Sequence, residues 1–330
     1  MSGLVCGLDV HKRHCEATVI DWFGNVIESR RISKDELYSF LSSMNVSLVA
    51  VESSSYVHPM YSKLRAMGLE VIVAHPKKTR LIAENRLKSD RRDSECLAEL
   101  ARLGALPSSY VPEGEVARMR ELVRRRAFLV RLRTRLKNRI TATLALEGVE
   151  VPKGLKLFTR NGLEWLRSLG MSSIDRYLRI LEGLNQEIGL VSKELDKYAG
   201  DEDVRLLMTI PGVGLYSALM IKAEIGDLSR FPDADHLCSY AGLVPSERSS
   251  GGRTRRGRIT EEGSRWLRWI MVEVAHVHVR YDTHFTRAYH RIAARRGKKV
   301  ATVALARRLL RCVYAMLRDR KPFVNRAQAR

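Results

Sequence analysis

Four acidic residues within the first hundred positions have the types and spacing that a metal-dependent enzyme needs. Asp9 ends one apolar run and Glu52 ends another, while Asp90 and Asp93 lie three residues apart in a segment with helical character. Carboxylates at the ends of neighbouring strands, joined by two from one face of a helix, can converge on hard divalent cations, whose ligands are oxygens. The pattern is typical of nuclease chemistry on a phosphodiester.

Each acid also has a simpler structural explanation. An aspartate at a strand end, such as Asp9 in GLDVHK, is often structural, and Asp90 can cap the helix that it begins. Glu52 is followed by three serines, whose small size would leave room for a ligand. Because converging carboxylates repel one another unless cations separate them, the four together favour a metal site that holds Mg²⁺ or Mn²⁺.

A serine and several arginines between Ala241 and Met271 form a second group. A flexible turn is expected at Ser249, Ser250, Gly251 and Gly252, followed by Arg253, Arg255, Arg256 and Arg258, with a helix that resumes near Gly263 and carries Arg265. A serine on such a loop can attack phosphorus while the arginines bind the phosphate. With no His or Lys nearby as an obvious general base, chemistry alone favours a phosphate-binding loop over a nucleophile.

The charge of the chain indicates a polyanionic partner. Its 330 residues carry a formal charge of +21, and Lys and Arg outnumber Asp and Glu by 21 to 5 in residues 251–330 but only by 15 to 13 in residues 1–110. Nucleic acid is therefore favoured over a membrane surface. Further candidates for phosphate contacts are Arg124, Arg125, Lys298 and Lys299.

The cysteines and the N-terminal segment indicate a reducing compartment, which we take to be the cytosol. The five cysteines are scattered and show no CxxC spacing, which argues against a zinc site or a disulfide framework. The opening residues do not follow the pattern of a secretory signal, and no apolar stretch approaches the length of a membrane span.

The first 110 residues predict a mixed α/β domain. Strands are expected at residues 3–9, 14–21, 24–32, 46–52 and around LEVIVAH, and helices at 34–43, 57–67, 77–84 and 91–103. This order is that of an RNase H-like domain, in which helices cover a mixed sheet. Such a fold would bring the four acids toward one edge.

Helices dominate the rest of the chain. A long Arg-rich helix is expected from Glu115 to about Leu146, and apolar residues from Tyr177 to Tyr198 recur in steps of four and three, as in a coiled coil. The two helices can pair within one chain or also dimerise the protein. In residues 204–330, IPGVG predicts a helix-hairpin-helix, in which Gly212 and Gly214 permit a tight turn facing a phosphate or serve only to pack two helices.

Both groups of residues resemble those of one family, the insertion-sequence transposases of the DEDD type, often called family one-ten. GLDVHK, AVESSS and LKSDRRDSECLAELARLG resemble its RuvC-like domain; TIPGVGLYSALMIKAEIGD and SYAGLVPSERSSG resemble its C-terminal transposase domain. The resemblance implies a RuvC-like domain at 1–110, a helical and dimerising linker at 111–203 and a transposase domain at 204–330. Ser94 departs from the family pattern, which more often has a small apolar residue there.

The resemblance also implies roles for the residues. Asp9, Glu52, Asp90 and Asp93 would hold the metal, and Ser250, or less favourably Ser249, would be the nucleophile that forms a covalent phosphoserine. Donor and target DNA would pair with a structured guide RNA, called a bridge RNA. Dimers assembling into tetramers would let the serine of one protomer reach the acids of another. A nuclease or Holliday-junction resolvase that uses water remains an alternative, as does a non-catalytic nucleic-acid-binding protein.

Overall fold

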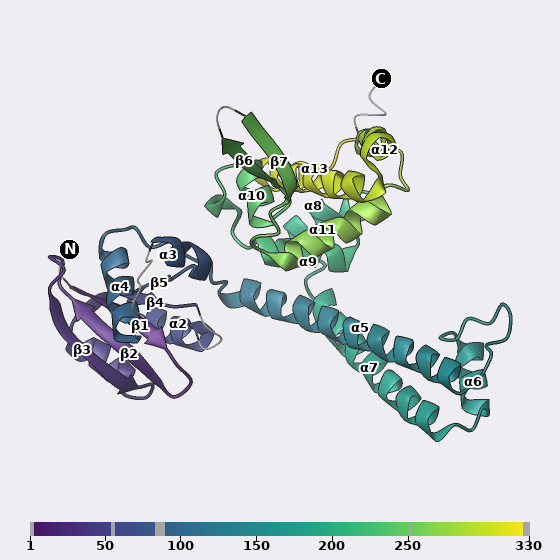
Figure 1. The fold of residues 1–330 in the computed structure, drawn as a ribbon, viewed down its shortest axis with the longest axis horizontal. Coiled ribbons are helices and arrows are strands. Elements are labelled where there is room, and N and C mark those ends of the chain that lie inside the picture. The colour runs from purple at the N-terminus through teal and green to yellow at the C-terminus, as the bar shows by residue number, and fades with distance from the viewer. Residues whose placement is uncertain (1–2, 54–56, 83–89, 251–252, 326–330) are drawn as a thin grey trace. The chain divides into compact units, whose positions relative to one another are not determined.

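The chain folds into two compact units, residues 1–113 and 114–330, in a computed structural model that describes residues 3–53, 57–82, 90–250 and 253–325 (Figure 1). Each unit has its own hydrophobic core. None of the described helices is long and apolar enough to cross a membrane.

A five-stranded mixed sheet forms the centre of the first unit. Its strands are β1 (Leu4–Val10), β2 (His14–Ile20), β3 (Val26–Ser33), β4 (Val46–Val51) and β5 (Glu70–Val73), in the spatial order β3-β2-β1-β4-β5. β1, β2 and β3 form an antiparallel meander, whereas β4 and β5 run parallel to β1. The central strands β1 and β4 are almost wholly buried, as continuous apolar runs predict.

Helices cover both faces of this sheet. α1 (Leu37–Ser43) and α2 (Val57–Ala66) pack on the face that carries Cys6, Leu8 and Val10, and α4 (Asp90–Arg102) packs on the other. α3 (Pro76–Ile82) follows β5. The sheet and its helices are consistent with the RNase H-like fold that the sequence predicts, and the expected order of elements is confirmed.

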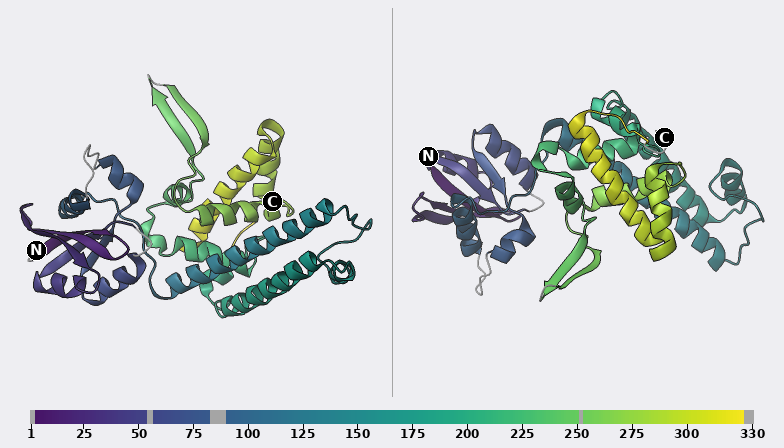
Figure 2. Two further views of the ribbon diagram at one scale, coloured as in Figure 1. Left: turned by 60° about the horizontal axis from the view of Figure 1, so that its bottom comes forward. Right: turned by 90° about the horizontal axis from the view of Figure 1, so that it is seen from above.

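The second unit begins with a helical hairpin. α5 (Gly114–Leu146) and α7 (Ser172–Asp196) pair within the one chain, with the short α6 (Arg160–Ser168) between them (Figure 2). Hydrogen bonds join Arg126 to Ser192 and Arg133 to Asn185. Later residues of α5 thus lie against earlier residues of α7. The pairing is therefore antiparallel, whereas a coiled-coil supercoil stays a prediction.

The remaining helices pack around one core. They are α8 (Glu202–Met208), α9 (Leu215–Ile225), α10 (Ala234–Tyr240), α11 (Arg265–His278), α12 (His284–Arg296) and α13 (Lys298–Asp319), with a 3₁₀ turn at Leu228–Arg230. The base of the hairpin contributes Leu122, Val123, Val191 and Leu195 to this same core. The segments expected as separate parts, 111–203 and 204–330, are thus joined by a shared core in one compact unit.

A two-stranded antiparallel ribbon occupies the region where a flexible loop is expected. β6 (Pro245–Ser250) pairs with β7 (Arg253–Ile259), with Ser250 opposite Arg253 and Ser249 opposite Thr254. The prediction of a flexible turn was therefore wrong for Ser249 and Ser250, and Gly251 and Gly252 lie outside the described residues. Cross-strand pairing outweighs the weak β propensity of this Arg-, Ser- and Gly-rich sequence.

Candidate functional site

The close approach of α4 to β1 positions the first candidate site. Val5, Gly7 and Asp9 alternate along β1 on the face that α4 covers. A Cβ built on Gly7 would lie 1.9 Å from the carbonyl oxygen of Ser94 and 2.7 Å from the backbone nitrogen of Ala98. Only glycine permits this contact, which places the first turn of α4 beside the end of β1.

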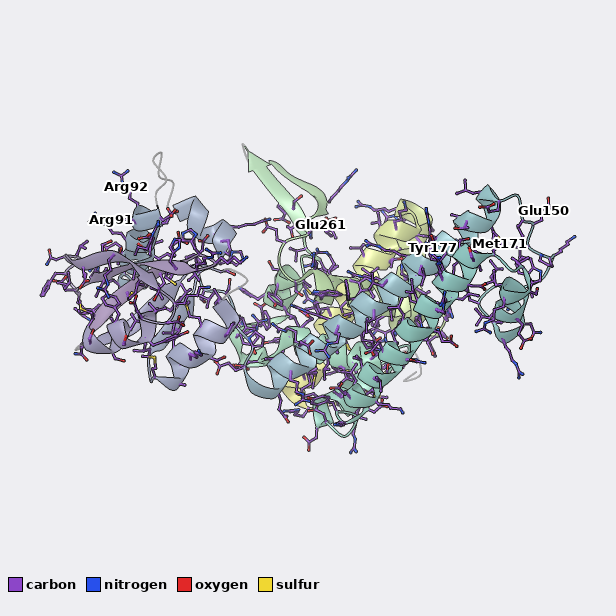
Figure 3. All side chains as sticks on the ribbon, turned by 90° about the horizontal axis from the view of Figure 1, so that it is seen from below. Arg91, Arg92, Glu150, Met171, Tyr177 and Glu261 are labelled. Atoms are coloured by element: carbon purple, nitrogen blue, oxygen red, sulfur yellow. The ribbon has the colours of Figure 1, made fainter. Side chains whose placement is uncertain are left out.

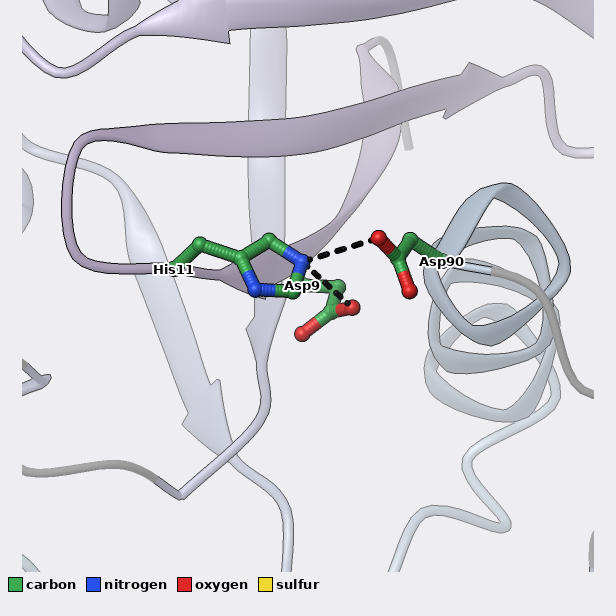
Figure 4. Close-up of side chains that lie close together, drawn as sticks. All are labelled: Asp9, His11 and Asp90. Carbon is green, nitrogen blue, oxygen red and sulfur yellow. Dashed lines mark ion pairs between the residues drawn. The ribbon is translucent and has the colours of Figure 1, made fainter.

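Three side chains from this junction converge (Figure 4). Nε2 of His11 lies 3.3 Å from a carboxylate oxygen of Asp9 and 3.2 Å from one of Asp90. Each of the three residues offers a ligand atom within 4.8 Å of the other two. Asp9 is buried, whereas about half of the Asp90 side chain is exposed, at 47%. The cluster is thus accessible from solvent on the side of Asp90.

The other two predicted acids, Glu52 and Asp93, belong to elements that meet at this cluster. Val51 pairs with Leu8, and the backbone nitrogen of Glu52 donates to the Leu8 carbonyl at 3.1 Å, so Glu52 directly neighbours Asp9 at the sheet edge. Asp93 lies in the first turn of α4 with Asp90. Among the described residues, however, the group that fits a metal comprises Asp9, His11 and Asp90 rather than the four predicted acids.

His11 is the residue of this site that the sequence reasoning missed. It follows Asp9 by two positions, and residues two apart on an extended chain share a face. That spacing within GLDVHK was the available signal. Lys12 and Arg13 follow, and the turn closes with the backbone nitrogen of His11 donating to the His14 carbonyl at 3.0 Å.

The donor set of this cluster fits a divalent cation. Nε2 of His11 is buried and makes no hydrogen bond, although it is directed at two carboxylates. Carboxylate oxygens suit Mg²⁺ and Mn²⁺, and an imidazole nitrogen is acceptable to transition ions. A cation between these three groups would satisfy the otherwise unpaired nitrogen and reduce the repulsion between the aspartates.

Ser94, the departure from the family pattern, has a packing role. It is fully buried on the side of α4 that packs on the sheet, where its hydroxyl lies 2.7 Å from that of Thr18 and donates to the carbonyl of Arg91 at 2.8 Å. The Thr18 hydroxyl in turn contacts that of Ser29 at 2.9 Å. This polar chain links α4 to β2 and β3, so a serine here holds the helix without entering the metal cluster.

The second candidate site lies on the ribbon. Ser250 ends β6, and the four arginines expected to bind phosphate lie in β7, where Arg258 is exposed. The side chains of Ser249, Ser250, Arg253, Arg255 and Arg256 lie outside what the structure describes. Arg265 begins α11 and is exposed, with its guanidinium 5.7 Å from the Trp266 ring centre.

The base of the ribbon is tightly anchored. Cβ atoms on Gly242 and Gly263 would lie 2.3 Å from the Glu262 carbonyl oxygen and 2.1 Å from the Tyr240 carbonyl oxygen, and both glycines have positive φ. Arg268 donates to the carbonyl of Ala241 at 2.9 Å. These contacts join the two strand ends to α10 and α11, so the ribbon emerges from a defined base.

Two of the predicted phosphate-binding arginines differ in their surroundings. Arg124 makes a bidentate pair with the fully buried Glu224, at 2.7 and 2.9 Å, and Glu224 also accepts from Ser264, the N-cap of α11. Arg125 is half-exposed and pairs with Glu121 one turn away. Arg124 therefore serves the fold, whereas Arg125 faces solvent.

The turn between α8 and α9 is packed on one side and open on the other. Gly212 has a φ of +90°, and a Cβ there would lie 3.2 Å from the backbone nitrogen of His278. Nδ1 of His278 lies 2.7 Å from the Pro211 carbonyl oxygen, and burial lowers the pKa of this histidine. Gly214 is exposed at the N-terminus of α9. Lys298 and Lys299 are exposed at the start of α13.

Comparison with known proteins agrees with these features. Residues 6–147 match a family of DEDD transposases of the IS110 type, described as Transposase, and residues 204–291 match the family described as Transposase IS116/IS110/IS902 family. The two matched regions contain the acid cluster and the serine ribbon respectively. Together they take in more than two thirds of the chain.

Individual relatives extend the similarity along nearly the whole chain. The transposase for insertion sequence element IS1111A of Coxiella burnetii is 29% identical over 95% of this chain and 89% of its own. A probable family 20 transposase of Pseudomonas aeruginosa is 26% identical over 94% and 96%. The pilin gene-inverting protein of Moraxella bovis is 36% identical over 37% of this chain and 38% of its own. This chain belongs to the IS110 family of DEDD transposases and is a DNA transposase.

Proposed function

We propose that this transposase cuts and rejoins DNA through a covalent bond to Ser250, with a divalent cation, Mg²⁺ or Mn²⁺, held by Asp9, Glu52, Asp90 and Asp93. The observation that carries the proposal is the convergence of Asp9 and Asp90, from β1 and α4, at 3.3 and 3.2 Å from one buried nitrogen atom. Carboxylates brought this close are stabilised by a cation.

The bonds in the proposed reaction balance without an external energy source. Ser250 Oγ loses its proton as it bonds to phosphorus, the bond from phosphorus to a deoxyribose oxygen breaks, and that oxygen takes up a proton. A hydroxyl of the recombining strand then loses its proton as it bonds to the phosphorus, the bond from phosphorus to Ser250 Oγ breaks, and Ser250 Oγ takes up a proton. When bound, the cation supplies positive charge at the phosphate and favours ionisation of a nearby hydroxyl. The four acids hold it there.

The arginines of β7, with Arg258 exposed among them, bind the phosphates on either side of the scissile bond. Stabilisation of developing negative charge by preplaced cations is a large part of phosphoryl transfer. Arg125, Arg265, Lys298 and Lys299 are exposed and add further positive charge, and the backbone amides at the exposed Gly214 turn can face a phosphate. Backbone phosphate contacts of this kind bind DNA with little sequence preference.

In this proposal a structured guide RNA selects the DNA sequences, and an oligomer of the transposase exchanges the strands. The similarity to a protein named for inverting a gene supports exchange of strands rather than cleavage alone. Dimers that assemble into tetramers on donor and target DNA supply enough active sites for the exchange. The hairpin leaves Phe128, Ile180 and Leu190 exposed, and these apolar side chains are available to a second copy.

The covalent step is tested by stopping the reaction with denaturant and looking for protein attached to DNA. The wild-type chain is expected to give an adduct that Ser250→Ala loses, because the proposal makes Ser250 Oγ the atom that bonds to phosphorus. Ser249→Ala is the matched control and is expected to keep the adduct. Full cleavage by Ser250→Ala would instead show that water attacks, as in a nuclease or resolvase.

The metal requirement is tested with Asp9→Asn in the same assay. The substitution keeps the size of the side chain but removes a ligand charge, so adduct formation in Mg²⁺ is expected to fall by at least about a hundredfold, as for other preplaced catalytic charges. Unchanged metal dependence and unchanged transposition in cells would favour a non-catalytic nucleic-acid-binding role.

A further inference from the structure

We propose that His11 is itself a metal ligand, so that the cation held by Asp9 and Asp90 is also bound by the Nε2 nitrogen of this histidine. The inference deepens the proposed function, because it rests on a cation at the same acids. It adds a residue that the pattern of four acids does not contain.

The distances match those of neighbouring ligands around one ion. In an octahedral site with bonds of about 2.1 Å, adjacent ligand atoms lie about 3 Å apart. Nε2 lies 3.3 Å from the Asp9 oxygen and 3.2 Å from the Asp90 oxygen, and the three residues offer ligand atoms within 4.8 Å of one another. One ion can therefore contact all three with small adjustments.

The surroundings of Nε2 support coordination rather than a simple hydrogen bond. The atom is buried and makes no hydrogen bond, even though two carboxylate oxygens lie within 3.3 Å. A buried polar atom that remains unpaired calls for a missing partner such as an ion. Its position between two acids identifies that partner as a cation.

The backbone and a neighbouring ring hold His11 in this orientation. Its backbone nitrogen donates to the His14 carbonyl at 3.0 Å, which closes the turn between β1 and β2. The His14 ring lies against the His11 ring at a tilt of 33°, with centroids 4.7 Å apart. Because the turn restrains the backbone and the neighbouring ring restrains the side chain, little conformational freedom is lost when a metal binds.

A nitrogen ligand changes which ions the site prefers. Carboxylate and water ligands suit Mg²⁺, whereas imidazole binds transition ions such as Mn²⁺ more readily. The site is therefore expected to favour Mn²⁺ over Mg²⁺ more strongly than one built from carboxylates alone. His11→Ala should lower affinity for Mn²⁺ by at least about tenfold, the size of effect that even outer partners of metal ligands produce.

Electron spin echo spectroscopy of Mn²⁺ bound to the full-length protein tests the assignment, because it detects a nitrogen bonded directly to the ion. The wild-type chain is expected to show this nitrogen coupling. His11→Ala should still bind Mn²⁺, more weakly, but without the coupling. His14→Ala is the matched control, since it removes the neighbouring ring and not the ligand, and it should keep the coupling.

Three results would overturn the assignment, and they differ in what else they overturn. One is Mn²⁺ binding that depends on Asp9 while the wild type shows no nitrogen coupling, and another is coupling that persists in His11→Ala. Either result removes His11 from the site and leaves the metal site intact. Mn²⁺ binding that is unchanged in Asp9→Asn overturns the proposed metal site, and His11 with it.

Discussion

At the scale of single residues, Gly7 does as much to build the acid cluster as the acids themselves. It has no side chain on the face where α4 crosses β1, and a methyl group there would overlap the backbone of Ser94 and Ala98. Backbone atoms cannot move aside as a flexible side chain can. The separation of Asp9 and Asp90 therefore depends on this one position.

Gly7→Ala is expected to move α4 away from β1 and to weaken metal binding. Overpacking of this kind costs about 1–3 kcal/mol of unfolding free energy, and a displacement of about 1 Å at a site can reduce its function about a hundredfold. Urea unfolding and Mn²⁺ titration of the same variant measure both effects. Gly183→Ala, on an open face of α7, is the control and should leave metal binding unchanged.

The sequence predicted the acids of the site better than its complete set of side chains. Asp9 and Asp90 were identified from residue type and from their places at a strand end and a helix start, and the structure brings them together. His11 was not predicted, because hard divalent cations prefer oxygen ligands and a histidine side chain offers none. Its participation depends on the turn to His14, which the strand pattern does not determine.

At the scale of elements, α5 connects the hairpin to the helices that carry the ribbon. Arg120 of α5 donates to the backbone carbonyls of Ala223 and Glu224, and Arg124 donates to the Glu224 carboxylate. The same carboxylate accepts a hydrogen bond from Ser264, where α11 begins. A run of arginines in the sequence indicates only a basic helix. Burial of a single glutamate on α9 decides which arginine turns inward.

Arg124→Gln and Arg125→Gln are therefore expected to differ in their effect on stability. Arg124→Gln leaves the buried Glu224 without its bidentate partner and should cost about 2 kcal/mol of unfolding free energy, a value reduced from that of a fully buried pair because Arg124 is 40% exposed. Arg125→Gln should change stability by less than about 0.5 kcal/mol, since its pair with Glu121 is on the surface.

DNA binding at several salt concentrations completes the comparison. If Arg125 contacts a phosphate, its removal is expected to lower the dependence of log affinity on log salt by about one unit. Urea unfolding of the same variant shows whether a change in DNA affinity comes from a loss of stability instead. An Arg124→Gln protein with the stability of the wild type would show that the buried pair contributes little.

The ribbon shows where local sequence reasoning was insufficient. Arg-, Ser- and Gly-rich segments have weak strand propensity, so a loop was the natural prediction for residues 249–258. Pairing between β6 and β7 and the anchoring at Gly242 and Gly263 provide what propensity does not. Long-range contacts of this kind cannot be inferred from spacing alone.

At the scale of the whole molecule, the alternation of strands and helices was enough to predict the mixed sheet. Its order, β3-β2-β1-β4-β5, follows from a meander and two parallel crossovers. The heptad pattern of α7 predicted an apolar seam but could not choose between a partner helix in the same chain and one in another. Pairing with α5 uses the face that carries Leu181, Ile188 and Val191.

The division of the proposed machinery between two units gives the last prediction. The acids belong to residues 1–113 and Ser250 belongs to residues 114–330, so each protomer carries both halves. If the serine of one protomer acts with the acids of another, mixing Asp9→Asn and Ser250→Ala chains should restore part of the adduct that neither gives alone. In such a mixture some sites combine intact acids with an intact serine. Serine and acids that act within one chain would leave every mixed site defective, so absence of adduct, with mixed oligomers verified by two affinity tags, would contradict the shared site.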